Sequence, residues 1–202
     1  MKPGSSSRGR GIKIYRTYER VVNRINQLKG NTRLWVVQKC IENPMIVNDR
    51  KFDIRQWVLV TDWNPLTIWA YSESYIRFCV QAYDKKADTR KNHLTNNSVQ
   101  KKYAEFEDNE IDGNMWSSQE FADHLDQEYG GDPWTEKVWP QIKKYVKASL
   151  QSVQDIVDNR KNSFEFFGYD FMLDEDMRVW LIEVNSSPSM DMGTPTTEVL
   201  VQ

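Results

Sequence analysis

The chain has 202 residues, of which 39% are hydrophobic and 28% charged, so it can bury a core and is not a disordered tail. Its formal net charge of −2 excludes a generally basic nucleic-acid binder, and no stretch reaches the roughly 18 uncharged apolar residues of a membrane span. Two cysteines and two histidines argue against a disulfide scaffold and a structural zinc site. We therefore expect reduced thiols, and neither nucleic acid nor a membrane as a partner.

Charge is distributed unevenly along the chain. Residues 1–58 contain 13 Lys or Arg against 4 Asp or Glu, whereas residues 105–136 contain 11 Asp or Glu and no Lys or Arg. A basic N-terminal part suits phosphates or an acidic polypeptide. Two solvated surfaces of opposite sign explain the same counts, and charge alone does not choose between the two interpretations.

The first 50 residues predict short elements. Ile12–Tyr15 has the pattern of a short strand, and apolar residues from Tyr18 to Leu28 follow helical spacing up to a stop at Gly30. Leu34–Val37 is an apolar run that predicts a short buried strand. Asn43-Pro44 and the residues after it predict turns before the next strand.

The middle of the chain predicts a strand at Phe52–Asp62, a turn at Asn64-Pro65, a returning strand at Leu66–Tyr71 and a further strand at Tyr75–Val80. A polar stretch at 84–114 predicts irregular structure, and a capping box at Ser117–Glu120 then opens a helix that ends at the break Gly130–Pro133. Apolar spacing from Val138 to Ile156 predicts an amphipathic helix. Two strands follow, at Phe164–Leu173 and Met177–Val184. Strands, then helices, then a hairpin predict an α+β fold with an antiparallel sheet.

The last hairpin carries the clearest chemical pattern. Glu183 and Asn185 are two residues apart and share a strand face, and an even turn such as Glu175-Asp176 places Asp170 on that face too. Oxygen donors converging within apolar strands suit Mg²⁺. An ordinary solvent-facing strand face would show the same alternation, so the pattern leaves both interpretations open.

Cations recur in two other places. Lys51, Asp53 and Arg55 alternate with apolar residues and share one strand face, which can hold a phosphorylated ligand or form a solvated ion pair. Lys2, Arg8 and Gly9 belong to a basic, glycine-containing loop whose backbone N–H groups can approach phosphate oxygens. That loop lacks the Walker and Rossmann spacings, and a flexible basic segment is the alternative.

Arg77 lies in a strand-like segment, and His93 opens a polar loop that continues with Thr95 and Asn96. Either segment can line a site. For His93 a hydrogen-bonding role in the loop is favoured over a role as catalytic base.

Taken in order, these segments resemble the tubulin–tyrosine ligase-like family of ATP-grasp ligases. The resemblance extends over almost the whole chain and rests on Lys2-Pro3 with Ser7–Ile12, Val37–Pro44, Lys51–Arg55, Tyr75–Arg77, His93–Asn96, Phe167–Asp170 and Trp180–Pro188. Thr61–Thr67 and Asn114–Gln119 are most similar to the glycylase branch, and within it to the initiating monoglycylases.

The resemblance implies an α+β, ATP-grasp-like fold with antiparallel sheets and flanking helices that clasp ATP. In this family the Lys-Pro segment follows a hydrophobic strand and an N-terminal domain. We therefore expect an N-terminally truncated fragment in which that domain is missing. Residues 1–50 would be the rest of the central subdomain and residues 51–202 the C-terminal subdomain.

The resemblance also implies a reaction, which needs ATP and Mg²⁺. A glutamate γ-carboxylate of a tubulin C-terminal tail attacks the ATP γ-phosphate, and the amine of free glycine then displaces phosphate from the acyl phosphate. The expected partners are tubulin and microtubules, the expected protein is a monomer, and the expected locations are the cytoplasm, the cytoskeleton and the axoneme of cilia. A glutamylase of the same family and a non-catalytic nucleotide- or microtubule-binding fragment are the alternatives.

Site roles follow from family position. Arg55 and Arg77 would stabilise the transferring phosphoryl group, and Arg8 would contact the acceptor glutamate. The remaining roles are Mg²⁺ binding by Asp170, Glu183 and Asn185, and nucleotide binding by Lys2, Arg8, Gly9, Gln38, Lys39, Cys40, Ile41, Lys51, Asp53, Thr95 and Asn96.

Overall fold

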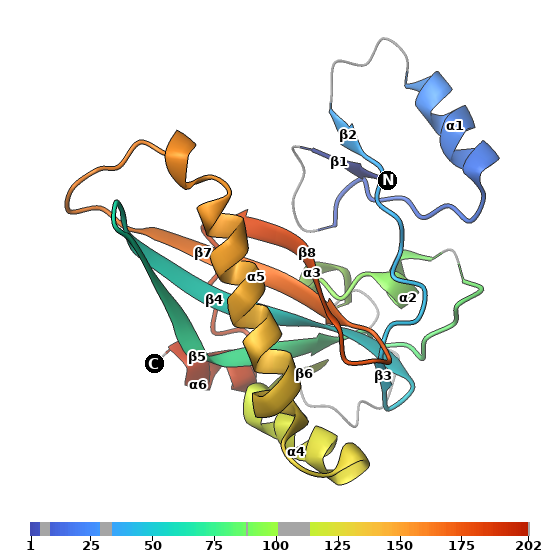
Figure 1. Ribbon diagram of the computed structural model, residues 1–202. Helices are drawn as coiled ribbons and strands as arrows, with labels where there is room; N and C mark the ends of the chain where they lie inside the picture. Colours follow the sequence, from blue (N-terminus) through green and yellow to red (C-terminus); the bar gives the residue numbers. More distant parts are fainter. Residues whose placement is uncertain (5–8, 29–33, 88, 101–113, 202) are drawn as a thin grey trace.

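The computed structural model describes residues 1–4, 9–28, 34–87, 89–100 and 114–201. Its centre is an antiparallel sheet in the order β6-β5-β4-β7-β8, with the short strand β3 paired to β4 (Figure 1). The strands are β3 Ile46–Val47, β4 Arg50–Trp63, β5 Leu66–Phe78, β6 Met115–Ser117, β7 Glu165–Leu173 and β8 Val179–Ser186. This architecture confirms the predicted α+β class.

Two of these strands are long and define the sheet. β4 and β5 form a hairpin through a cis Asn64-Pro65 peptide, which confirms the predicted turn. The segment from Leu66 to Phe78 is one strand, so the prediction of two separate strands there is wrong. A register shift opposite Gln56 lets this single strand bend and keep its pairing with β4.

Helices cover both faces of the sheet. They are α4 Ser118–Tyr129, the π-helical turn Trp134–Val138, α5 Trp139–Gln151 and α6 Pro195–Val201. α5 lies across one face, where Ile142 and Val146 pack with Ile54 and Val58 in the main core (Figure 1). On the opposite face α6 adds Leu200 to a smaller cluster with aromatic residues of β4 and β5.

The structure confirms the predicted capping box. The Ser117 side chain accepts from the Glu120 backbone N–H, and the Glu120 carboxylate accepts from Ser117, which satisfies donors at the start of α4. α5 ends at Gln151, however, and not at Ile156, which is 82% exposed. Gln154 donates to the Trp63 carbonyl oxygen at 3.0 Å, which ties the following 3₁₀ turn to the end of β4.

A small N-terminal part lies apart from the main sheet (Figure 1). It comprises β1 Lys2–Pro3 paired with β2 Trp35–Val36, and the helix α1 Tyr18–Gln27. The helix confirms its prediction, and Thr17 caps it; the expected stop at Gly30 lies outside the described residues.

One strand prediction in this part is wrong, and a second is wrong only in its burial. Ile12–Tyr15 forms no strand. Leu34–Val37 contains the predicted strand as β2, but the strand is not buried, because Leu34 is 81% exposed and Val36 and Val37 are also exposed.

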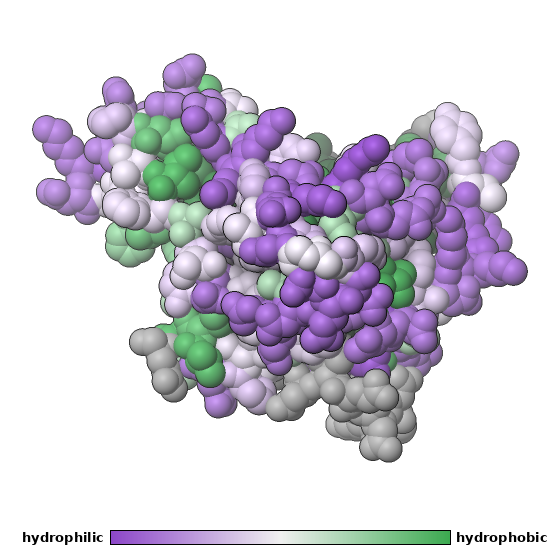
Figure 2. All heavy atoms as spheres, turned by 60° about the horizontal axis from the view of Figure 1, so that its bottom comes forward, coloured by the Kyte–Doolittle hydropathy of each residue, from purple (hydrophilic) through white to green (hydrophobic). Residues whose placement is uncertain are grey.

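Polar residues between β5 and β6 include two helical turns, α2 Arg90–His93 and α3 Asn97–Gln100, in a stretch that we expected to be irregular. Residues 101–113 of that stretch lie outside the described residues. In the part of the chain that the structure describes, no helix is long and apolar enough to cross a membrane. Hydrophilic side chains cover most of the face shown in Figure 2, interrupted by separate hydrophobic patches.

Candidate functional site

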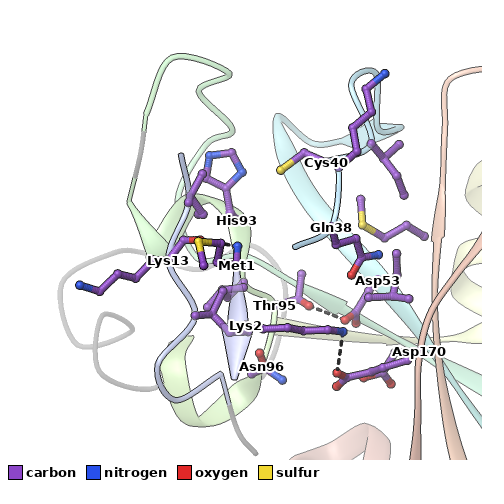
Figure 3. A pocket seen from close by; sticks show the side chains of 18 of the residues that line it. Met1, Lys2, Lys13, Gln38, Cys40, Asp53, His93, Thr95, Asn96 and Asp170 are labelled. Carbon is purple, nitrogen blue, oxygen red and sulfur yellow. Dashed lines mark hydrogen bonds and ion pairs between the residues drawn. The ribbon is translucent and has the colours of Figure 1, made fainter. Parts of the chain in front are cut away.

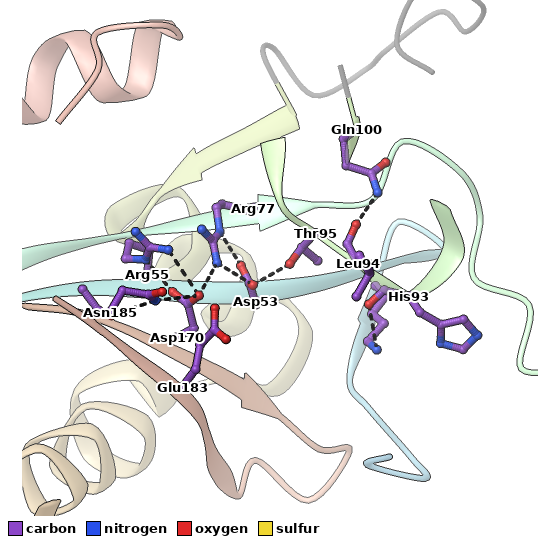
Figure 4. Close-up of polar contacts among 12 residues, drawn as sticks. Asp53, Arg55, Arg77, His93, Leu94, Thr95, Gln100, Asp170, Glu183 and Asn185 are labelled. Carbon is purple, nitrogen blue, oxygen red and sulfur yellow. Dashed lines mark hydrogen bonds and ion pairs between the residues drawn. The ribbon is translucent and has the colours of Figure 1, made fainter. Parts of the chain in front are cut away.

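Four neighbouring strands carry charged side chains on one face of the sheet (Figure 4). Asp53 of β4 pairs with Arg77 of β5, and Arg55 of β4 pairs with Asp170 of β7. Asp170 pairs in turn with Glu183 of β8. Directly opposed residues project from the same face, so these five side chains meet although they are far apart in sequence. The pairing confirms that Asp170 and Glu183 share a face.

Asp170 is the centre of this network and is only 3% exposed. Arg55 donates from Nε to Oδ1 at 2.5 Å and from Nη2 to Oδ2 at 3.2 Å, and Arg77 Nη2 lies 3.1 Å from Oδ2. Burial alone would raise the pKa of this carboxyl, but Arg77 and Arg55 outweigh burial and hold the pKa of Asp170 below its ordinary 3.8. Asp170 is therefore a buried, ionised carboxylate.

Asp53 holds the second arginine in place. Arg77 donates from Nε and Nη2 to its two oxygens at 2.7 and 2.6 Å, and Thr95 Oγ1 donates to Oδ2 at 2.5 Å. The bidentate pair fixes the plane of the Arg77 guanidinium, which bridges Asp53 and Asp170. Thr95 thereby connects the loop after α2 to the charged face of the sheet.

The pKa of Glu183 shifts in the opposite direction from that of Asp170. Burial and the charge of Asp170 raise the pKa of Glu183 above its ordinary 4.5, and the Lys2 ammonium, 3.7 Å from Oε2, only partly offsets them. Asn185 donates from Nδ2 to the Gly168 carbonyl oxygen at 3.1 Å and lies 3.4 Å from Asp170 Oδ2. Glu183 thus carries a charge that the neighbouring protein cations do not fully balance.

This charged face forms one wall of a pocket between the main sheet and the N-terminal part (Figure 3). The pocket opens to solvent, and the space within it is about 1170 Å³ when the open solvent at its mouth is included. Apolar groups such as Val37, Ile41 and Met172 line it together with charged ones. A pocket with an apolar part and an end rich in charge suits a ligand with a base and phosphates.

Lys51 reaches the pocket from the start of β4. Its ammonium donates to the His93 carbonyl oxygen at 3.3 Å, and burial lowers the pKa of Lys51 from its ordinary 10.5. On the other face of the same strand Phe52 and Ile54 are buried in the main core, so the predicted alternation is confirmed. His93 itself contacts the Ala87 carbonyl oxygen from Nε2 at 2.6 Å, in agreement with a hydrogen-bonding role.

The structure brings most of the predicted site residues together. The pocket is lined by Lys2, Gln38, Lys39, Cys40, Ile41, Lys51, Asp53, Thr95, Asn96, Asp170 and Glu183. Three further predicted residues do not line the pocket but contact Asp170, which does; they are Arg55, Arg77 and Asn185. Gly9 adopts φ of +68° close to Asn96, and its carbonyl oxygen accepts from Arg90. Arg8 lies outside the described residues.

Sequence reasoning missed several lining residues. Met172 is two positions from Asp170, so the alternation of a strand could have placed it on the same face. Ile182 could not be found in this way, because a register shift between Asp170 and Phe171 turns it toward the pocket. Lys13 and Val21 line the pocket because the N-terminal part folds over it, which no local pattern indicates.

The oxygen donors of this site fit Mg²⁺. Among the described residues no three or more histidine, cysteine, aspartate or glutamate side chains are grouped to hold a metal ion. Mg²⁺, however, is commonly bound by one or two carboxylates together with phosphate oxygens. Asp170 and Glu183 supply two such carboxylates beside the pocket. The charge of Glu183 is not fully balanced by neighbouring cations, which favours a bound cation there.

Comparisons with known proteins identify relatives that match almost the whole of this chain. Tubulin glycylase 3C of Tetrahymena thermophila is 48% identical over 100% of this chain, which covers 19% of that protein. Protein monoglycylase TTLL8 of Mus musculus is 44% identical over 99% of the chain, and Tubulin monoglycylase TTLL3 of Homo sapiens is 44% identical over 98%. The chain covers 25% and 26% of these two proteins. It therefore spans about a fifth to a quarter of the length of the curated relatives it matches.

Residues 1–202 match the sequence model of the family described as "Tubulin-tyrosine ligase family". The expected ATP-grasp-like fold class is thereby confirmed. With its antiparallel sheet and charged pocket, this chain belongs to the tubulin–tyrosine ligase family.

Proposed function

We propose that this chain forms part of an ATP-dependent ligase that adds glycine to glutamate γ-carboxylates in tubulin C-terminal tails. The observation that supports this most strongly is the pocket in which Asp170, held by two arginines, stands beside Glu183. The relatives named as tubulin glycylases and monoglycylases support glycine as the amino acid and tubulin as the substrate. A place on the microtubule cytoskeleton, and in the axoneme of cilia, follows from such a substrate.

The charges of the site suit phosphoryl transfer to a carboxylate. In the proposed reaction the γ-carboxylate takes up the γ-phosphoryl group of ATP, and the glycine amine then displaces phosphate from the acyl phosphate. Two negative groups must approach each other, so cations have to reduce their repulsion. Arg55 and Arg77 supply buried positive charge, and Lys2 supplies a further positive charge at the pocket side of Glu183.

Mg²⁺ would be held by Asp170, Glu183 and the Asn185 amide, and when bound it neutralises phosphate charge. Asp53 and Thr95 keep Arg77 in place at the edge of the nucleotide pocket. Lys51 and the segment Gln38–Ile41 would hold the adenosine end, the latter mostly through backbone groups. The division of the chain at about residue 50 into two subdomains belongs to the same proposal.

Incorporation of labelled amino acids into tubulin tests this proposal. The full chain is incubated with microtubules, ATP and Mg²⁺, and with either labelled glycine or labelled glutamate. Incorporation of glycine that requires both ATP and Mg²⁺ supports the proposal. Incorporation of glutamate identifies a glutamylase, and microtubule binding without incorporation of either identifies a non-catalytic module; both results contradict the proposal.

The two cysteines give an independent test of where ATP binds. Cys40 is exposed at the pocket, whereas Cys79 is buried and desolvation raises the pKa of its thiol to about 12. The thiolate is the form that alkylating agents attack. Iodoacetamide is therefore expected to modify Cys40 and leave Cys79 unmodified, and saturating ATP with Mg²⁺ should slow the modification of Cys40. Mass spectrometry of the two peptides measures both rates, and a Cys40 rate unaffected by ATP would argue against this pocket.

A further inference from the structure

Gly168 occupies the middle of the site face without a conformational need for glycine. It lies on β7 between Trp57 of β4 and Asn185 of β8, two residues before Asp170. Positive φ values occur at other glycines of the chain but not at Gly168. The backbone at residue 168 therefore does not require glycine, and a glycine inside a strand often marks a place where another group approaches closely.

That space is filled by two groups from outside β7. A Cβ atom at residue 168 would lie 2.7 Å from the Cβ of Pro188, 3.1 Å from Nη1 of Arg55 and 3.3 Å from Cδ of Arg55. Carbon atoms in contact are normally about 3.5–4.0 Å apart. The Arg55 side chain therefore crosses directly over Gly168 on its way to Asp170.

Neither group can yield easily. Arg55 is held at its far end by the bidentate contact with Asp170, and its side chain is only 10% exposed. Pro188 follows Ser187, which has φ of +54° and donates its N–H to the Phe166 carbonyl oxygen at 3.2 Å. A side chain at residue 168 would thus have to displace the Arg55 guanidinium, the Ser187-Pro188 turn or both.

We infer that Gly168 is a positioning residue for Arg55. Because residue 168 has no side chain, it leaves a narrow space, bounded by Pro188, in which the Arg55 guanidinium lies against Asp170. The inference rests on the proposed function, because it assigns Arg55 to the transferring phosphoryl group. Misplacing a catalytic group by about 1 Å can cost roughly a hundredfold in rate. Gly168 consequently acts on catalysis through Arg55 and touches no substrate itself.

The Gly168→Ala variant tests this inference in the full chain by two measurements. The first is the NMR signal of the arginine Nε–H groups, assigned with Arg55→Lys and Arg77→Lys. The Arg55 signal should shift, because its bond to Asp170 is disturbed, whereas the Arg77 signal should stay, because its Nε donates to Asp53 at 2.7 Å on the neighbouring strand pair. The second is the kinetics of ATP-dependent glycine incorporation, in which kcat should fall by roughly tenfold to a hundredfold with little change in KM for ATP.

The outcomes separate this inference from the proposed function. If both arginine signals move equally, or if neither moves, the inference is overturned. Unchanged kcat, or a rise confined to KM, overturns it while the proposed function stands. If the wild-type chain incorporates no glycine, the proposed function fails and the NMR signals still decide the role of Gly168. Should Gly168→Ala not fold, Gly168→Ala with Pro188→Gly removes the 2.7 Å contact, and the same selective shift of the Arg55 signal is required.

Discussion

Replacing Asp170 with asparagine is expected to destabilise the fold by about 3–5 kcal/mol, because the substitution leaves buried arginine charge without its partner. Arg55 is 8% exposed and Arg77 6% exposed, so water cannot solvate the guanidinium groups once the carboxylate charge is gone. Arg77 keeps its ion pair with Asp53, whereas among the described residues Arg55 forms an ion pair with Asp170 alone. Urea unfolding followed by circular dichroism measures the free energy of unfolding.

Asp176→Asn is the matched control for this prediction. The Asp176 side chain is 70% exposed and lies 3.7 Å from Arg178, so its loss should change the free energy of unfolding by less than about 1 kcal/mol. A similarly small change for Asp170→Asn would contradict the view that the buried charges depend on Asp170.

The pH dependence of unfolding follows from the same carboxylate. The folded-state pKa of Asp170 is below its ordinary 3.8, so the stability from its ionised form is complete above that value. It is lost as the pH falls through the lowered folded-state pKa. Asp170→Asn should therefore lose less stability than the wild type does on acidification below about pH 4.

Replacing Glu183 with glutamine is expected to abolish Mg²⁺-dependent ATP binding without lowering the stability of the ligand-free chain. Folding raises the pKa of Glu183 above 4.5, so folding favours the protonated form, and the ionised form costs stability as the pH rises through the folded-state pKa. Glutamine cannot ionise and keeps the shape of the side chain. It also removes the carboxylate that Mg²⁺ would use.

Thermal unfolding with and without ATP and Mg²⁺ tests both halves of the Glu183 prediction. Tm of the ligand-free variant should equal or exceed that of the wild type, and the increase in Tm on adding ATP with Mg²⁺ should disappear. Glu165→Gln is the control, because Glu165 is exposed near the start of β7 and should keep the increase. A ligand-free Tm well below that of the wild type, or an increase in Tm that survives, would contradict the assignment.

Much of the sheet could be predicted because its strands carry strong local patterns. Alternation from Phe52 to Asp62 and in the last hairpin placed β4, β7 and β8. Asp170 and Glu183 share a face as predicted, but the expected even turn is wrong: Leu173 pairs with Val179 across the odd loop 174–178, and the register shift between Asp170 and Phe171 brings Asp170 opposite Glu183. Turn and cap residues at Asn64-Pro65 and Ser117 gave two boundaries correctly. These signals lie within a few residues of the element that they specify.

The contacts between side chains could not be predicted in the same way. Nothing local indicates that Arg55 and Arg77 both reach Asp170, or that Thr95 donates to Asp53, because these pairs depend on strand order and register. Short apolar runs also misled about burial, since Leu34–Val37 is as apolar as a buried strand and contains β2, but Leu34, Val36 and Val37 are exposed. Tertiary packing decides such cases, and the sequence pattern does not contain it.

The most direct test of the central claim is calorimetric titration of the full chain with ATP in the presence and absence of Mg²⁺. The charges around Asp170 and Glu183 predict binding that is strong only when Mg²⁺ is present and that weakens as Glu183 is protonated on acidification. Wild-type chain that binds no ATP, or that binds it equally well without Mg²⁺ and in the Glu183→Gln variant, would contradict a nucleotide and metal site on this face of the sheet.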